Sequence, residues 1–176
     1  MRLASYEVTI AAPIEVVWAH LTTAEGLVRW IGPEATADPA PGGVLRWTHP
    51  NGASVAGRFV ELVPHRRLVF TYGWEDGRMG VPPESTTVEV DLVEEDGATI
   101  VRLVHHGLPP EAVQNHQRGW AYFLGALRAT LSPGWASASR GHTRDHTPRS
   151  DAAAAGLACR RCPAGRGCRR GVDSWR

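Results

Sequence analysis

Apolar residues recur at every second position through most of the segment between residues 44 and 106. That spacing is typical of β-strands with one buried face. One regular run places Leu68, Phe70 and Tyr72 on one face, and a later run does the same with Val88 and Val90. The pattern predicts strands over residues 3–10, 44–49, 53–63, 67–74, 85–94 and 99–106.

Two other segments repeat every three or four residues, which is the spacing of an amphipathic helix. A short helix is predicted over residues 13–22, and Thr22-Thr23 is suited to cap a second one that carries Leu27 and Trp30. A long helix is predicted over residues 109–131, because two prolines and an acidic residue suit its first turn. Its apolar stripe comprises His116, Trp120, Phe123, Leu124, Leu127 and Leu131.

Turn residues separate these elements. The segment 39–43 is rich in Pro and Gly, Asn51-Gly52 is suited to a hairpin, and Asp96-Gly97 connects the last two strands. The order is one strand, two short helices, a run of antiparallel strands and one long helix, which indicates an α+β fold. A curved antiparallel sheet wrapped around the C-terminal helix would bury the apolar face of both.

Charge divides the 176 residues into two parts. Residues 1–131 contain 10 Arg and 15 acidic residues, for a net charge of −5. Residues 132–176 contain 9 Arg and 3 acidic residues, for a net charge of +6. We therefore expect a folded domain at 1–131 and a disordered Arg-rich tail at 132–176. An acidic domain is not expected to bind nucleic acid through its folded surface.

The tail holds every cysteine of the chain, Cys159, Cys162 and Cys168. Three hypotheses for the tail remain open. The thiols could ligate zinc, the arginines could contact an acidic surface, or the segment could be disordered without a role. The composition is also consistent with an out-of-frame extension of a GC-rich coding sequence, which intact-mass measurement would detect.

Nothing in the sequence indicates export or membrane insertion. Residues 1–131 lack cysteine, the N-terminus has no basic region followed by an apolar run, and no segment approaches eighteen apolar residues. A cytoplasmic, reducing compartment is expected.

Five segments together resemble a known family. They are TIAAPIEVVWAHLTTAEGLVRWIGP, Pro41–Gly43, GRFVELVPHRRLVFTYGW, LVHHGLP and the RGW of residues 118–120. In this order they resemble the START-like, SRPBCC superfamily, and within it the branch named for homology to the activator of the heat-shock protein 90 ATPase. The resemblance covers roughly residues 3–131. It implies a helix-grip fold, like that of birch pollen allergens, in which the long helix closes a cavity against the sheet.

On this fold, aromatic and aliphatic residues that face between sheet and helix are candidates for lining a ligand cavity. The alternative is that the same residues are ordinary core, as we expect for Trp18. The candidate ligand-binding residues are Trp30, Trp47, Phe59, Phe70, Tyr72, Trp74, His105, His116, Trp120, Phe123, Leu124 and Leu127.

Candidate chemistry is sparse. His105 shares a strand face with Val101 and Leu103, so it is expected to point inward, where it could bond a ligand or act as an acid or base. Its neighbour His106 should face solvent, and the same is expected of Glu61. No metal-ligand spacing and no nucleophile motif is present in the predicted domain, so we expect no metal, no cofactor and no assigned catalysis.

Three functions remain open at this point. The sequence favours a protein that binds a small hydrophobic molecule over an enzyme. A co-chaperone-like or regulator-associated interaction protein, with a homodimer, regulator or chaperone as its partner, is the second. A cyclase, dehydratase or hydrolase acting on a hydrophobic substrate is the third.

Overall fold

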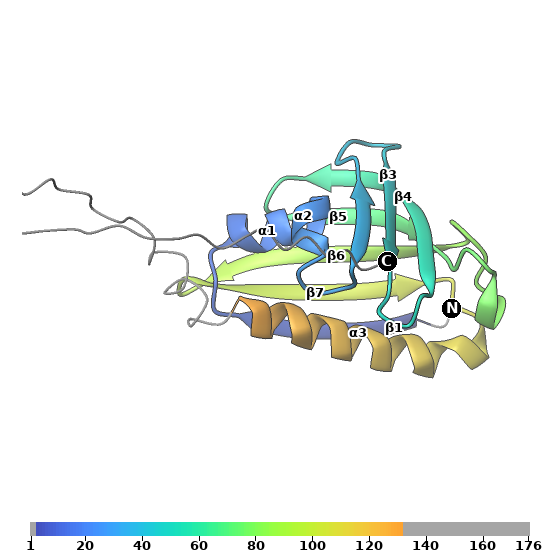
Figure 1. Cartoon of the computed structure of the whole chain (residues 1–176). Helices are drawn as coiled ribbons and strands as arrows, with labels where there is room; N and C mark the ends of the chain where they lie inside the picture. The colour runs from blue at the N-terminus through green and yellow to red at the C-terminus, as the bar shows by residue number, and fades with distance from the viewer. Residues whose placement is uncertain (1–2, 132–176) are drawn as a thin grey trace, which may run out of the picture. The chain divides into compact units, whose positions relative to one another are not determined.

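A seven-stranded antiparallel sheet is the framework of residues 3–131, the part of the chain that the computed structural model describes. The strands lie in the order β1-β7-β6-β5-β4-β3-β2 (Figure 1). They are β1 (Leu3–Ile10), β2 (Glu34–Ala37), β3 (Val44–Thr48), β4 (Ser54–Val63), β5 (Arg67–Tyr72), β6 (Thr86–Glu95) and β7 (Ala98–His106).

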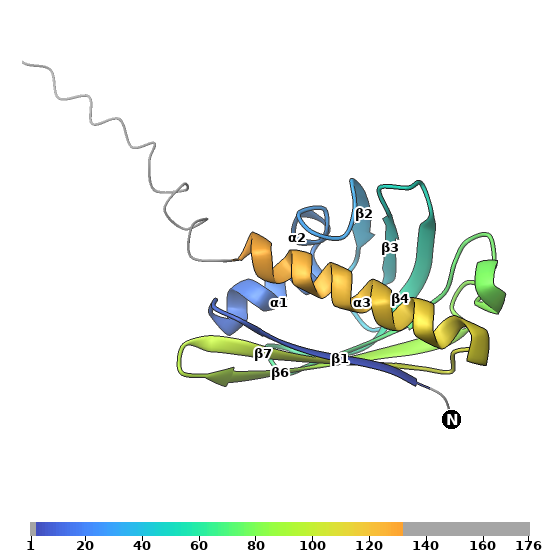
Figure 2. The ribbon, with the colours of Figure 1, turned by 90° about the horizontal axis from the view of Figure 1, so that it is seen from below.

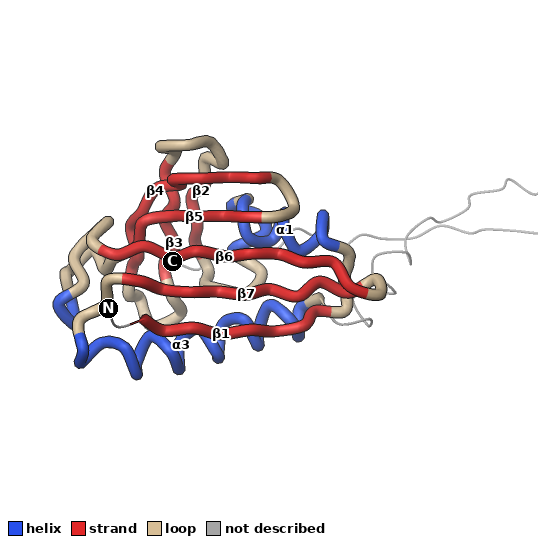
Figure 3. Tube along the Cα trace, turned by 180° about the vertical axis from the view of Figure 1, so that it is seen from behind, coloured by secondary structure: helices blue, strands red, loops and turns tan. Residues whose placement is uncertain are grey.

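Four helical segments accompany the sheet. They are α1 (Ile14–Thr22), α2 (Ala24–Leu27), the 3₁₀ turn η1 (Arg78–Gly80) and α3 (Pro110–Thr130). Figures 2 and 3 place α1 and α3 on the same side of β6 and β7. This arrangement confirms the predicted α+β helix-grip fold, with the sheet curved around a long C-terminal helix.

The first strand of the chain pairs with the last one. Leu3 lies opposite His106 and Ile10 lies opposite Thr99, so β1 extends the sheet beyond β7. The helix α3 then packs along β1 (Figure 1). The N-terminal strand therefore joins the sheet and also supports the long helix.

The sheet bends within β4, where its pairing changes from β3 to β5. The register of β4 with β5 shifts between Phe59 and Glu61, and such irregularities bend a strand. Just before it, a Cβ on Gly57 would stand 1.8 Å from the carbonyl oxygen of Thr71, so only glycine fits there. This bend turns β2 and β3 across the direction of β6 and β7 (Figure 3).

The alternation predicted from the sequence is reproduced in the strands. Leu45 and Trp47 of β3 are buried, and so are Val88 and Val90 of β6. In α2, the Thr23 side chain accepts a hydrogen bond from the Gly26 amide at 3.0 Å, which confirms the predicted cap.

One strand was not predicted. β2 has the sequence EATA, which lacks a large apolar side chain and alternates only between exposed and half-buried positions. It lies at the sheet edge and pairs only with β3. Its conformation therefore depends on the partner strand and not on its own hydrophobic pattern.

The predictions for residues 132–176 lie outside the described residues. They concern the disordered tail, the zinc ligands Cys159, Cys162 and Cys168, and the out-of-frame extension. The division of the chain at residue 131 remains our proposal.

Candidate functional site

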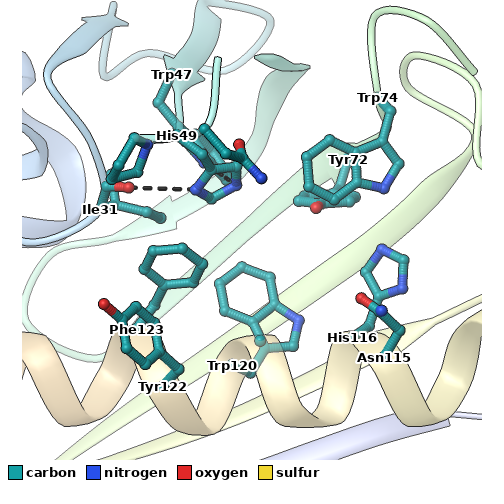
Figure 4. A pocket seen from close by; sticks show the side chains of 13 residues that line it. Ile31, Trp47, His49, Tyr72, Trp74, Asn115, His116, Trp120, Tyr122 and Phe123 are labelled. Atoms are coloured by element: carbon teal, nitrogen blue, oxygen red, sulfur yellow. Dashed lines mark hydrogen bonds between the residues drawn. The ribbon is translucent and has the colours of Figure 1, made fainter. Parts of the chain in front are cut away.

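A pocket of about 320 Å³ lies between α3 and the concave side of the sheet (Figure 4). Residues of α3 form one wall. Residues of β3, β5 and the segments that follow these two strands form the other, together with Ile31 from the segment between α2 and β2. The thirteen lining residues are Ile31, Trp47, His49, Pro50, Asn51, Tyr72, Trp74, Asn115, His116, Gly119, Trp120, Tyr122 and Phe123.

The helical wall follows from the spacing of α3. His116, Trp120 and Phe123 recur at intervals of four and three residues and so point to one side of the helix. His116 and Trp120 are buried, whereas Tyr122 at the pocket edge is 71% exposed. Figure 4 shows His116, Trp120 and Phe123 directed from the helix toward the sheet.

The sheet wall follows from strand alternation. Trp47 in β3 and Tyr72 in β5 have their ring centroids 5.9 Å apart, and Tyr72 and Trp74 are 5.8 Å apart in an edge-to-face contact. Across the pocket, Tyr72 lies 5.9 Å from Trp120. Offset and edge-to-face pairs at these distances are favourable, so the rings support one another.

His49 is fixed by hydrogen bonds on both ring nitrogens. Its Nδ1 lies 3.2 Å from the Ile31 carbonyl oxygen, and the Trp47 indole donates to its Nε2 at 3.2 Å. Because a carbonyl only accepts, Nδ1 carries the proton and the ring is neutral. Burial lowers the pKa of His49, which agrees with this assignment. Phe123 stacks on this ring at 4.6 Å.

His105 lies behind the pocket wall and does not line it. The Trp120 indole donates to its Nδ1 at 3.1 Å, so the proton of the neutral ring is on Nε2. Nε2 then donates to the Thr86 hydroxyl at 2.8 Å, and that hydroxyl donates to the Tyr72 carbonyl at 2.7 Å. Burial lowers the pKa of His105 to about 3. Both nitrogens are engaged, so the ring serves to position Trp120.

His116 presents a free lone pair. Its Nδ1 donates to the Ala112 carbonyl at 2.9 Å, which leaves Nε2 as an acceptor. That atom is buried without a hydrogen-bond partner, and the indole nitrogen of Trp74 is in the same condition. The two rings are 6.0 Å apart. Burial lowers the pKa of His116, so this ring is also neutral near pH 7.

No lining residue is acidic, and none is Lys or Arg. The nearest cation identified at the site is Arg78, whose guanidinium carbon lies 5.5 Å above the Trp74 ring. Arg78 also forms an ion pair with Asp76, which offsets its charge. The pocket is therefore apolar and uncharged, with a few neutral polar groups.

The structure brings together six of the predicted ligand-binding residues and separates the others. The six that line the pocket are Trp47, Tyr72, Trp74, His116, Trp120 and Phe123. A second, small void of about 20 Å³ is lined in part by Trp30, Phe70 and Leu124. Phe59, Leu127 and His105 line neither space.

Several lining residues were not predicted. His49 continues the buried face of Leu45 and Trp47, and this alternation is a signal that could have identified it. Asn115, Gly119 and Tyr122 form a second stripe beside the apolar one, with helical spacing. They carry too little apolar character for a hydrophobic pattern to select them.

Three further residues had a sequence-based expectation. Glu61 is exposed, as expected, and bonded to Arg67 at 3.4 Å. His106 lies on the outer face of the sheet, but it is half-buried, and its Nε2, 3.7 Å from Glu89, is buried without a hydrogen-bond partner, because the neighbouring strands cover it. Trp18 is half-buried and packs against the core.

Within residues 3–131, no three His, Cys, Asp or Glu side chains gather in a way that could hold a metal ion. No described helix is both long enough and apolar enough to cross a membrane.

Residues 11–132 match the family described as Activator of Hsp90 ATPase homolog 1-like protein. No curated protein sequence matches the chain.

Solved structures with the same fold are numerous. The chain is similar to the Aha1 dimer from Colwellia psychrerythraea, with 24% identity and a TM-score of 0.64 over 76% of this chain and 98% of that one. It is similar to CalU16 from Micromonospora echinospora, with 25% identity and a TM-score of 0.58 over 78% and 88%.

A third similar structure is DynU16, a protein from the dynemicin biosynthetic locus. It shares 25% identity with a TM-score of 0.64 over 75% of this chain. The chain spans about half of DynU16, covering 48% of its length.

Proposed function

The chain belongs to the Activator of Hsp90 ATPase homolog 1-like family, a branch of the START-like, SRPBCC superfamily, and on this premise we propose that it binds a small, mainly apolar molecule in the pocket under α3. The observation that carries the proposal is the pocket itself: about 320 Å³, lined by aromatic rings from helix and sheet. Ligand pockets are typically ~300–1,000 Å³ and mostly apolar with a few polar groups. The volume suits a small ring system.

Gly119 supports this proposal. It faces the pocket from α3, and a Cβ at this position would meet no atom within 4 Å. Glycine within a helix costs about 1 kcal/mol relative to alanine. Because Gly119 lines the pocket, its missing side chain leaves pocket space that a larger residue would occupy.

We infer binding without catalysis as the main role. His105, the predicted acid or base, has both nitrogens bonded to protein groups and lies behind Trp120. One similar protein, DynU16, comes from a biosynthetic locus, that of dynemicin, and this supports a small organic molecule as ligand.

The experiment compares Gly119→Leu with Gly125→Leu. Both glycines are in α3, and a Cβ added at either would meet no atom within 4 Å, but only Gly119 lines the pocket. Both variants should gain about 0.8 kcal/mol of helix propensity. Thermal-shift and native mass-spectrometry screens of aromatic metabolites, lipids and polyketides should give hits on the wild type and on Gly125→Leu.

The same screens should give no hits on Gly119→Leu. Absence of hits on the wild type, or equal binding by Gly119→Leu, would contradict a ligand site in this pocket.

The family description supports a second candidate, a protein partner whose ATPase the chain stimulates. The solved Aha1 structure is a dimer, which supports self-association as a related proposal. Measuring the ATPase turnover of a heat-shock protein 90 with and without the chain tests the first. A rise in turnover that survives in Gly119→Leu would assign the activity to a surface and not to the pocket.

A further inference from the structure

Trp74 and His116 are neighbours at one end of the pocket, with ring centroids 6.0 Å apart. The Trp74 indole nitrogen and His116 Nε2 are both buried without a hydrogen-bond partner among the described residues. Trp74 is 9% exposed and His116 is 4% exposed. Figure 4 shows the indole nitrogen of Trp74 on the side of its ring that faces His116.

Their hydrogen-bonding roles are opposite. An indole N–H only donates. His116 Nε2 only accepts, because Nδ1 holds the proton that is donated to Ala112. A buried donor or acceptor without a partner costs free energy. A ligand that bonds both atoms should therefore bind more tightly than one that bonds neither.

A hydroxyl group has the matching chemistry. Its oxygen accepts from Trp74 while its proton is donated to His116, whereas a carboxylate only accepts and an ammonium only donates. Both nitrogens are closed off from bulk solvent and from the empty space of the pocket. The proposal therefore requires the Trp74 and His116 rings to rotate when a ligand binds, so that its hydroxyl can reach both atoms. Any water that occupies this position must be replaced by a group with the same two bonds.

The charge of the lining residues also favours a neutral ligand group. None of the thirteen lining residues is acidic, Lys or Arg, so an ionised ligand group would be desolvated without a counter-charge. Arg78 above Trp74 is already paired with Asp76. Because Asp76 offsets the charge of Arg78, this side chain provides little net charge that could stabilise an ionised ligand group at Trp74.

We propose that the pocket selects neutral hydroxylated aromatic molecules, with the hydroxyl held between Trp74 and His116. This inference rests on the proposed function, since it assigns the chemistry of the ligand in the same pocket. It assigns the aromatic body of the ligand to the space between Trp120 and Phe123 on the helix and Trp47 and Tyr72 on the sheet.

Four probes of nearly equal shape test the inference: naphthalene, 2-naphthol, 2-naphthoate and 2-naphthylmethylammonium, titrated at pH 7 with quenching of tryptophan fluorescence. 2-Naphthol should bind about tenfold more tightly than naphthalene, as expected for two added hydrogen bonds. The two ions should bind more weakly than naphthalene.

The variants His116→Phe and Trp74→Phe keep an aromatic ring and remove one polar atom each. Each should reduce the preference for 2-naphthol over naphthalene, taken as the ratio of the two affinities in the same variant, to about twofold or less. Trp18→Phe, the same kind of change at a residue that does not line the pocket, should keep the preference.

The outcomes separate the two proposals. Equal binding of naphthalene and 2-naphthol, or tighter binding of either ion, overturns the hydroxyl assignment and leaves the apolar pocket as a binding site. A preference that persists in both phenylalanine variants also overturns it. Failure of all four probes to bind overturns this inference, while ligand screening on Gly119→Leu tests the proposed function separately.

Discussion

His105 lies at the centre of a chain of hydrogen bonds that runs from Trp120 through Thr86 to the Tyr72 carbonyl. The chain requires a neutral ring with the proton on Nε2. A second proton would sit on Nδ1, where the Trp120 indole already donates, and it would be buried without a counter-ion. Stability should therefore depend on keeping this residue neutral.

The pKa values predict the direction of that dependence. Burial lowers the pKa of His105 to about 3, below the value of about 6.5 expected for the unfolded chain. The unfolded state therefore binds the proton first. The stability contributed by neutral His105 is complete above about pH 6.5 and is lost as pH falls toward 3, by up to about 1.4 kcal/mol per pH unit.

Urea unfolding at pH 7.5, 6.0 and 5.0 measures this loss. His105→Gln should show a shallower fall in unfolding free energy between pH 6 and 5 than the wild type. His65→Asn, a change at an exposed histidine with φ of 61°, should follow the wild type. The prediction fails if the His105→Gln and wild-type slopes coincide.

At the residue scale, half of the candidate ligand-binding residues selected from the sequence line the pocket. Strand alternation placed Trp47, Tyr72 and Trp74 on the inner face, and helical spacing placed His116, Trp120 and Phe123. Periodicity identifies an inward face but not a distance from the empty space. It therefore could not separate Phe59 or Leu127, which are packed on all sides, from residues that border the pocket.

At the scale of elements, α3 combines two functions along its length. Leu124 and Leu127 are fully buried and anchor the helix, while Gly119 and Tyr122 border the pocket. The two sets lie on neighbouring stripes of the helix, so stability and binding can be changed separately at these positions.

This separation gives a prediction for neighbouring positions. Leu124→Ala should lower the unfolding free energy by about 2–5 kcal/mol, because it removes a fully buried side chain and leaves a cavity. Tyr122→Ala should change it by less than about 1 kcal/mol, since the side chain is 71% exposed. Urea denaturation of both variants provides the measurement. Similar losses for the two would show that α3 is not oriented as described.

The long elements were predictable and the short edge strand was not. α3 and strands β5–β7 carry enough large apolar residues to determine their own period. β2 carries none, and its pairing with β3 is a tertiary contact that no local pattern encodes. The bend at Gly57 was likewise absent from the prediction, because a close approach to Thr71 is visible only once β5 is in place.

At the scale of the whole molecule, the division of the chain at residue 131 remains to be tested. The last buried side chain of the described part is Leu131, and the family match ends at residue 132. A chain truncated after residue 132 should therefore unfold cooperatively, with a Tm within about 2 °C of the full chain. Differential scanning calorimetry of both proteins decides the point. A large fall in Tm would assign residues 133–176 a role in the folded domain.

The most direct test of the account is a titration with 2-naphthol followed through the indole N–H signals in ¹⁵N-labelled protein. Trp47, Trp74 and Trp120 line the pocket, whereas Trp18 does not. We predict that the signals of the three lining residues shift, with Trp74 moving downfield as it donates to the hydroxyl, while Trp18 stays in place. Unchanged signals for Trp47, Trp74 and Trp120, or shifts confined to Trp18, would contradict a ligand site between α3 and the sheet.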